Sequence, residues 1–260
     1  IRVMGMIQLE VLKELLDVRF GLKVEFDKPT VIYRETIAQE AVGFYAYTMP
    51  KPCWAVLKFL ITPLPRGSGV QYESIVPVRD IMERYQHQVE QALPTALRQG
   101  MLGWQVDDVK ITLMGGEHHL IHTHPLDFIV CTPIALMDGL RRGGSVLLEP
   151  MMRLRITAPE GYLGRLVSET AAMGGEVEAT EVRGGVLRMV SHAPLANCMN
   201  FSQRLAALTS GSGALSMELC GYRDCTFDES KRCPRKSVHP LDVSKYILAA
   251  RSALEGGIFG

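Results

Sequence analysis

The order of predicted elements in the last third of the chain constrains the fold more than any other feature. Strands and helices are predicted in turn at residues 153–158, 159–173, 176–182, 186–192, 196–209 and 214–219. The strands show alternating apolar and polar residues, and the helices show apolar residues three to four positions apart. The tripeptide Arg183-Gly184-Gly185 is typical of a hairpin turn. This βαββαβ order within about 70 residues predicts a ferredoxin-like domain.

The segment before this domain also mixes strands and helices, but in another order. Apolar runs separated by Pro- and Gly-containing turns predict strands at residues 31–36, 42–49, 53–62 and 70–76. Their succession is compatible with an antiparallel meander. A helix at 79–99, which Pro94 should kink or break, a strand at 106–114, a helix at 126–142 and a strand from 146 follow. We therefore predict the α+β class with several domains.

Both ends of the chain carry a predicted helix. Residues 7–20 have helical apolar spacing, and residues 22–26 then alternate as a strand does. One helix and one strand cannot bury their apolar faces alone, so we interpret them as the αβ end of a domain that starts upstream. A basic linker and a helix from residue 243 end the chain. The predicted division is 1–28, 29–152, 153–224 and 225–260.

The charge balance limits how the chain can meet a polyanion. Its 260 residues contain 28 Lys and Arg against 28 Asp and Glu, so the formal net charge is zero. Coating nucleic acid by bulk electrostatics requires a surplus of cations, which this chain lacks. Any contact with nucleic acid is therefore expected at a few local sites.

The lengths of the apolar runs and the spacing of the cysteines indicate the cellular compartment of the protein. No apolar run reaches the roughly 20 residues that cross a bilayer, and the first residues do not resemble a secretory signal. The six cysteines are scattered without a Cys-x-x-Cys pair. We therefore expect a cytoplasmic protein with reduced thiols and no membrane partner. Among the cysteines, only the cluster of Cys220, Cys225 and Cys233 suggests a metal site.

A histidine-rich loop is the first candidate site. Four of the seven histidines lie between residues 118 and 124. Imidazoles can stack on unpaired bases or hydrogen-bond to phosphate. His122 and His124 would share one face of a strand, as zinc ligands can, although Glu117 is the one acidic ligand at a suitable spacing. A contact loop, a plain polar loop and a metal site all stay open at this point.

A basic segment is the second candidate site. Lys231, Arg232, Arg235 and Lys236 fall within six residues. Such a charge run is typical of a solvated surface, and it also suits contact with RNA phosphates. By contrast, the dipeptide Gly-Lys occurs nowhere, so the chain has no phosphate-binding loop of the G-x-x-x-x-G-K-[ST] type.

Separated motifs along the whole chain carry a resemblance to a known family. The residues concerned are Gly5-Met6-Ile7-Gln8-Leu9-Glu10-Val11, Lys28-Pro29-Thr30-Val31-Ile32-Tyr33-Arg34-Glu35, Pro63-Leu64-Pro65-Arg66-Gly67-Ser68-Gly69-Val70-Gln71-Tyr72-Glu73-Ser74 and Leu147-Leu148-Glu149-Pro150. They resemble the C-terminal half of elongation factor G and its relatives. Residues 67–74, Trp54, residues 99–104 and Cys233-Pro234-Arg235 most resemble the tetracycline-resistance ribosomal protection proteins.

The resemblance implies a C-terminal fragment without the GTPase domain. It would comprise the end of the third domain, a ribosomal-protein-like α/β fourth domain, a ferredoxin-like fifth domain and a terminal helix. GTP and magnesium would bind in the absent domain, and these residues would carry no catalytic group, cofactor or metal.

The resemblance also implies a partner, the ribosome. The fourth domain would reach small-subunit rRNA at the decoding centre and dislodge tetracycline, and we expect a monomer in solution. The residues expected to contact the ribosome are Gly116, Glu117, His118, His119, Leu120, Ile121, His122, Lys231, Arg232, Arg235 and Lys236.

The histidine-rich loop departs from the protection-protein pattern. Those proteins usually carry an aromatic pair followed by Ser-Pro-Val where this chain has residues 118–122, and His119 coincides with a tip histidine typical of elongation factor G. Two alternatives therefore stay open. The chain could belong to a divergent elongation factor G paralogue without a resistance role, or form a metal-binding module built on residues 118–124.

Overall fold

The computed structural model of the chain describes residues 6–26, 30–48 and 53–255. The chain forms two compact units, which we call the first unit (residues 1–32 and 149–223) and the second unit (residues 33–148 and 224–260). In the described residues, every helix is too short or too polar to cross a lipid bilayer.

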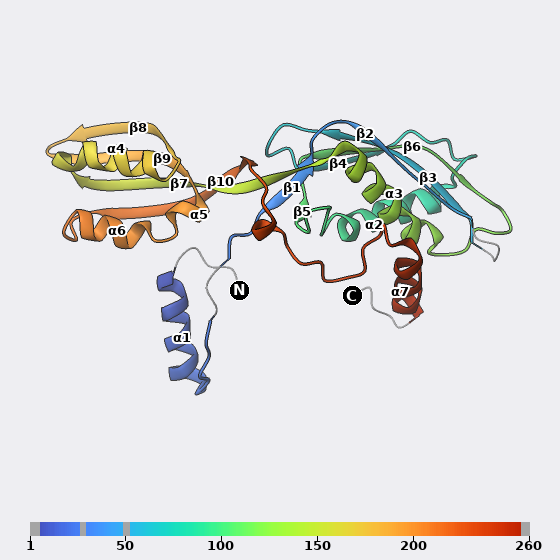
Figure 1. The fold of residues 1–260 in the computed structure, drawn as a ribbon, viewed down its shortest axis with the longest axis horizontal. Helices are drawn as coiled ribbons and strands as arrows, with labels where there is room; N and C mark the ends of the chain where they lie inside the picture. Colours follow the sequence, from blue (N-terminus) through green and yellow to red (C-terminus); the bar gives the residue numbers. More distant parts are fainter. Residues whose placement is uncertain (1–5, 27–29, 49–52, 256–260) are drawn as a thin grey trace. The chain divides into compact units, whose positions relative to one another are not determined.

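The first unit contains the predicted βαββαβ order (Figure 1). Its elements are β7 (Ser145–Pro159), η1 (Glu160–Tyr162), α4 (Leu163–Ala172), β8 (Glu176–Arg183), β9 (Val186–Pro194), α5 (Leu195–Cys198), α6 (Phe201–Leu208) and β10 (Ala214–Cys225). Strand β9 lies between β7 and β8 and is antiparallel to both, and β10 also pairs with β7. This order, β10-β7-β9-β8, confirms the predicted ferredoxin-like fold.

The turn and the core of the first unit follow from the sequence pattern. Gly184 and Gly185, with φ of +58° and +78°, join β8 to β9 in a conformation that suits a hairpin and that glycine adopts without strain. The core is formed by buried apolar residues of the sheet and helices, among them Leu154, Ile156, Leu166, Leu187, Met189, Phe201 and Leu205.

The second unit is built on a four-stranded sheet. Its strands, in spatial order, are β2 (Ala41–Tyr47), β3 (Ala55–Pro63), β6 (Val109–His118) and β4 (Val70–Ser74). Strand β3 pairs antiparallel with β2 and β6, whereas β4 pairs parallel with β6. The interpretation as a meander is therefore wrong, because β6 comes later in the chain yet lies between β3 and β4.

Burial explains why β6 takes the inner position. Val109, Ile111 and Leu113 of β6 are fully buried, whereas Val70 of β4 is exposed and Tyr72 is half-buried. A strand that buries this much apolar surface is stable in the middle of a sheet, and a polar strand is better placed at the edge.

Two helices pack within this unit. Helix α3 (Asp127–Gly143) packs against α2 (Glu83–Ala96) and against strands β2 and β3 (Figure 1). Gly43 and Gly139 permit this close approach, since a Cβ on Gly43 would collide with the carbonyl oxygen of Ala135. Helix α2 keeps Pro94 inside its last turn, and at Glu83–Ala96 it starts later and ends earlier than the predicted range 79–99.

The remaining elements of the second unit support its candidate sites. Strand β1 (Arg34–Ile37) pairs parallel with β5 (Gln105–Val106) and antiparallel with the first residues of β7. A short helix η2 (Glu229–Lys231) leads into the basic segment, and the terminal helix α7 (Val243–Glu255) packs on α3.

One predicted element is missing near the start of the chain. Helix α1 spans Met6–Phe20 as predicted, but residues 21–26 have no regular secondary structure. A strand requires a neighbour for its backbone hydrogen bonds, and no strand in the described part of the chain pairs with this segment. The role of residues 1–28 as the end of a further domain stays a prediction.

Candidate functional site

The histidine-rich segment begins in a strand rather than in a loop. Residues 116–118 belong to β6 and pair with residues 55–57 of β3. Gly116 is required by this pairing, because a Cβ there would collide with the carbonyl oxygen of Val56. The predicted loop therefore starts three residues later, and we call residues 119–126 the tip loop.

His118 faces the body of the unit. Its Nδ1 lies 2.8 Å from the carbonyl oxygen of Asp80, and its backbone N–H donates to the same oxygen at 3.0 Å. The imidazole also contacts the ring of Tyr85 in α2, with 5.7 Å between ring centroids. His118 thus joins the end of β6 to the segment that leads into α2.

His119 orders the tip loop from within. Its Nδ1 accepts the backbone N–H groups of Ile121 and His122, each at 3.2 Å. Its ring contacts the rings of Trp54 and His122, with centroid distances of 5.4 and 4.4 Å. One ring nitrogen thus binds two successive backbone N–H groups and fixes the path of the turn.

Leu120 and Ile121 lie at the turn that His119 orders. Their exposed fractions are 81% and 76%. Single exposed apolar residues are common, but two adjacent ones on an internally bonded turn form a small apolar surface with no packing role in this unit.

Two side chains tie the tip loop to the segment before β3. The Thr123 hydroxyl accepts the N–H of His119 at 2.8 Å and donates to the carbonyl of Trp54 at 2.7 Å. Asp127 Oδ2 accepts the N–H groups of Trp54 at 3.0 Å and of His124 at 2.8 Å. Both sides of the base of the loop are therefore held by hydrogen bonds.

Asp127 is itself held by the end of the chain. It is the first residue of α3 and is only 2% exposed, and this burial raises its pKa. The N–H groups of His124 and Trp54 and the charge of Arg251 in α7 oppose that rise. The cluster was not predicted from the sequence, although an acid at a helix start is a recognisable signal for Asp127.

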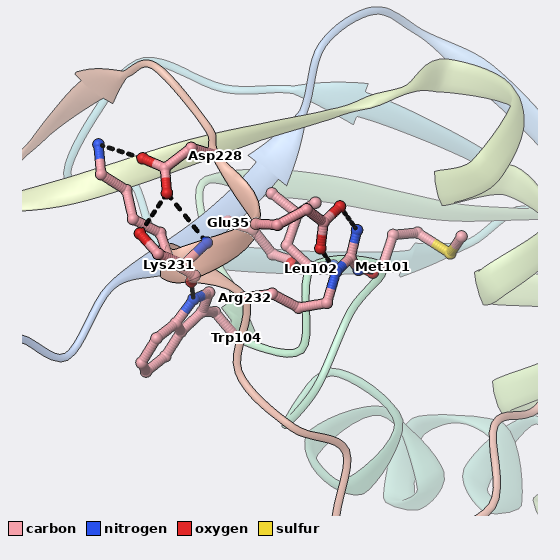
Figure 2. A network of polar contacts seen from close by, with 9 residues as sticks. Glu35, Met101, Leu102, Trp104, Asp228, Lys231 and Arg232 are labelled. Carbon is pink, nitrogen blue, oxygen red and sulfur yellow. Dashed lines mark hydrogen bonds and ion pairs between the residues drawn. The ribbon is translucent and has the colours of Figure 1, made fainter.

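The basic segment packs onto residues 99–104 of the same unit. Figure 2 shows the indole of Trp104 beneath Lys231, whose carbonyl accepts the indole N–H at 2.7 Å. Next along the chain, Cys233 donates its N–H to the carbonyl of Leu102 at 3.1 Å. Both hydrogen bonds attach the backbone of the segment to this loop.

The two arginines of the segment continue this attachment. Arg232 pairs with Glu229 at 2.7 Å and donates to the carbonyl of Met101 at 3.0 Å (Figure 2). Arg235 donates to the carbonyl of Gly100 at 2.9 Å. Both guanidinium groups therefore bind the carbonyl oxygens of one loop.

The two lysines differ from each other. The Lys231 ammonium donates to the carbonyl of Thr226 at 2.8 Å, whereas Lys236 is exposed and bonds to Gln99 through its backbone N–H at 3.0 Å. The prediction that all four cations contact RNA is not tested by these contacts, but the contacts give three of the side chains an internal role.

A buried carboxylate lies under residues 99–104. Glu35 of β1 is 1% exposed, and its Oε2 accepts the N–H of Leu102 at 2.6 Å. Burial raises the pKa of Glu35 to about 7, against the opposing effects of the loop amides and the charge of Arg235. Glu35 was not among the residues predicted to form a site, because a carboxylate in a short strand usually points to solvent.

Neither candidate site has the arrangement of a metal centre in the part of the chain that the structure describes. Among the residues that the structure describes, no three His, Cys, Asp or Glu side chains are placed to hold a metal ion. The ring nitrogen of His119 is occupied by backbone N–H groups, and Nδ1 of His124 lies 2.8 Å from the carbonyl of His122. The tip loop presents apolar and imidazole faces, and the basic segment stabilises the unit.

Two family models match the chain. The model "Elongation factor G, domain IV" matches residues 29–144, and "Elongation factor G C-terminus" matches residues 146–233.

Curated relatives and a solved structure are similar over most of this chain. Tetracycline resistance protein TetP of Clostridium perfringens is 30% identical over 98% of this chain and 39% of its own length. TetM of Staphylococcus aureus (30% identical) and TetO of Streptococcus pneumoniae (32%) match 86% and 85% of this chain and 35% of their own length. A crystal structure of a Thermus thermophilus protein, 28% identical, has a TM-score of 0.75 and covers 85% of this chain and 34% of its own. The chain therefore spans less than half the length of the relatives it matches.

Proposed function

Because the chain belongs to the elongation factor G family, we propose that it is the ribosome-binding part of a protein that confers tetracycline resistance by ribosomal protection. The support comes from relatives named for tetracycline resistance, which match between 85% and 98% of the chain. Since the chain spans 35% to 39% of those relatives, the proposed activity is that of a longer protein.

The tip loop is the proposed contact with small-subunit rRNA at the decoding centre. Leu120 and Ile121 are exposed on a turn whose shape is fixed by His119. An imidazole can stack on an unpaired base, and aliphatic side chains can pack beside it, with little need for fixed charge, which agrees with the zero net charge of the chain. In this proposal the loop occupies the surroundings of tetracycline and dislodges it. The exposed pair on an ordered turn is the observation that carries the proposal.

In this proposal some of the predicted contact residues touch RNA, and the others hold the contacting segments in place. Leu120, Ile121 and His122 would touch RNA, and His119 would order the turn. Gly116, Glu117 and His118 would shape the strand that carries the loop. In the basic segment, Lys236 would be the residue most available to phosphate, whereas Lys231, Arg232 and Arg235 would hold the segment in place.

The residues of this chain do not fit a GTP site. A Walker-type phosphate loop needs a Gly-Lys dipeptide, and none occurs in the 260 residues. We therefore place GTP and magnesium in another part of the longer protein.

Co-sedimentation with ribosomes tests the proposed contact. The double variant Leu120→Ser with Ile121→Ser should bind about tenfold more weakly, the order expected when the apolar burial of one aliphatic side chain is lost. The matched control is Ile75→Ser with Val78→Ser, another pair of exposed apolar residues in the second unit, at 65% and 60% exposure. Equal binding by the tip variant and the control would remove the tip loop from the contact.

Expression of the full-length gene in a tetracycline-sensitive strain tests the resistance role. We expect the wild-type gene to raise tolerance and the tip variant to lose that gain. Ribosome binding without any gain in tolerance would assign the chain to an elongation factor G paralogue without a resistance role.

A further inference from the structure

The terminal helix reaches the base of the tip loop. Helix α7 packs on α3, and its residue Arg251 lies 3.2 Å from Asp127, with Nη2 facing Oδ1. These two residues are 124 positions apart in the chain. The contact lies wholly within the second unit.

Arg251 is fixed by two further interactions. Its Nε donates to the hydroxyl of Tyr47 at 2.7 Å, and its guanidinium carbon lies 5.5 Å from the centre of the Tyr47 ring. Tyr47 is a buried residue of β2. A guanidinium bound to two acceptors and a ring has little freedom, so its position relative to Asp127 is defined.

Asp127 links Arg251 to the backbone on both sides of the loop base. Its Oδ1 accepts a hydrogen bond from the guanidinium, while its Oδ2 accepts hydrogen bonds from the N–H groups of Trp54 and His124. A buried carboxylate needs a counter-charge to remain ionised, and an ionised carboxylate accepts hydrogen bonds more strongly than a neutral one. The cation on α7 therefore strengthens the two bonds that hold the tip loop.

We propose that Arg251 is a positioning residue of the tip loop, which acts through Asp127 to hold the backbone of Trp54 and His124 and thereby the turn that carries Leu120 and Ile121. The effect of this positioning on ribosome binding rests on the proposed function. The positioning itself can be measured without ribosomes.

Hydrogen exchange of the Trp54 and His124 amides tests the positioning in the chain alone. In Arg251→Gln both amides should exchange about tenfold faster, the order expected for losing one hydrogen bond to a charged group. Arg251→Lys keeps the charge and should recover most of the protection. Lys245→Gln removes a cation from an exposed position on the same helix and should leave both amides unchanged.

Ribosome binding then tests whether α7 acts through the tip loop. Arg251→Gln should weaken co-sedimentation several-fold in the wild-type background. In the background of Leu120→Ser with Ile121→Ser it should have no further effect, because the surface that it positions is already removed.

The outcomes separate this inference from the proposed function. Unchanged exchange at both amides in Arg251→Gln would overturn the positioning role, whatever the ribosome does. An equal loss of ribosome binding in both backgrounds would also overturn it, since α7 would then touch the ribosome directly. Absence of ribosome binding by the wild-type chain would overturn the proposed function, while the exchange result would still decide the positioning role.

Discussion

The tip loop and the basic segment lie in the same unit, yet they use their side chains in opposite ways. In the tip loop the backbone, His119 and Thr123 make the internal bonds, and Leu120 and Ile121 are left exposed. In the basic segment, the guanidinium groups of Arg232 and Arg235 donate hydrogen bonds to the carbonyl oxygens of residues 101 and 100.

Charge in a sequence therefore does not mark a contact surface by itself. A guanidinium group has five donors, so it can bind carbonyl oxygens and carboxylates of its own chain. An aliphatic side chain has no such partner on a turn, and it stays available for another molecule. Four experiments test this contrast, and both tryptophans lie in the second unit, so fluorescence follows its unfolding.

The greatest loss of stability is expected from Gly103→Ala, beneath the basic segment. Gly103 has φ of +86°, and a Cβ there would collide with the backbone carbonyl of Cys233. The left-handed conformation and the overpacking together should lower the free energy of unfolding by roughly 4 kcal/mol. Urea unfolding followed by fluorescence measures this. A loss below about 1 kcal/mol would mean that the basic segment is not packed on residues 99–104.

A large pH-dependent effect is expected from Glu35→Gln. Because burial raises the Glu35 pKa from 4.5 to about 7, the folded chain holds a proton that the unfolded chain releases. The free energy of unfolding should therefore fall as pH rises from about 4.5 to 7, by about 3 kcal/mol, and then level off.

Glu35→Gln should remove this decline, because glutamine does not ionise. Urea midpoints between about pH 4.5 and 8 measure the slope in both proteins. Glu149→Gln, a change of charge in the first unit, is the control and should leave the slope of the second unit intact. Parallel slopes for wild type and Glu35→Gln would contradict the role assigned to the buried carboxylate.

A moderate effect is expected from replacing the tryptophans one at a time. Trp104 uses its indole N–H to hold the basic segment, whereas Trp54 uses its backbone N–H and carbonyl at the tip loop. Trp104→Phe should cost about 1 kcal/mol for the lost hydrogen bond, and Trp54→Phe should cost less than half of that. Thermal unfolding by circular dichroism avoids the loss of the fluorescent reporter. Equal costs would contradict the contrast between the two regions.

The weakest effect on stability is expected from Leu120→Ser with Ile121→Ser. Both side chains are more than three-quarters exposed, so the free energy of unfolding should change by less than about 0.5 kcal/mol. Differential scanning calorimetry checks this. A larger loss would mean that the pair packs within the unit, and a fall in ribosome binding could then not be assigned to contact.

Local pattern was sufficient to predict the fold wherever neighbouring elements pair with each other. The βαββαβ order, the Gly184-Gly185 turn and helix α1 could all be predicted from periodicity and turn chemistry. The place of β6 between β3 and β4 could not, because it depends on the burial of Val109, Ile111 and Leu113 relative to β4 rather than on order along the chain.

The candidate sites show the same limit. The resemblance and the histidine spacing located the tip loop, but residues 116–118 form a strand because β3 offers them backbone partners. The roles of Glu35 and Arg251 could not be assigned, since each depends on a partner 67 or 124 residues away, whereas Asp127 carries the local signal of an acid at a helix start. Such partners have no periodic signal in a single sequence.

The inner position of β6 has a consequence for how the chain folds during synthesis. Strands β2 and β3 are neighbours in the chain and can pair once both are made, whereas the other edge of β3 has no partner until β6 has been synthesised. During that interval an apolar strand edge is open to pairing with another chain. The nascent second unit is therefore expected to depend on chaperones or on low concentration until residue 118 emerges, and mutations that slow this step should reduce the soluble yield more than they reduce the stability of the finished protein.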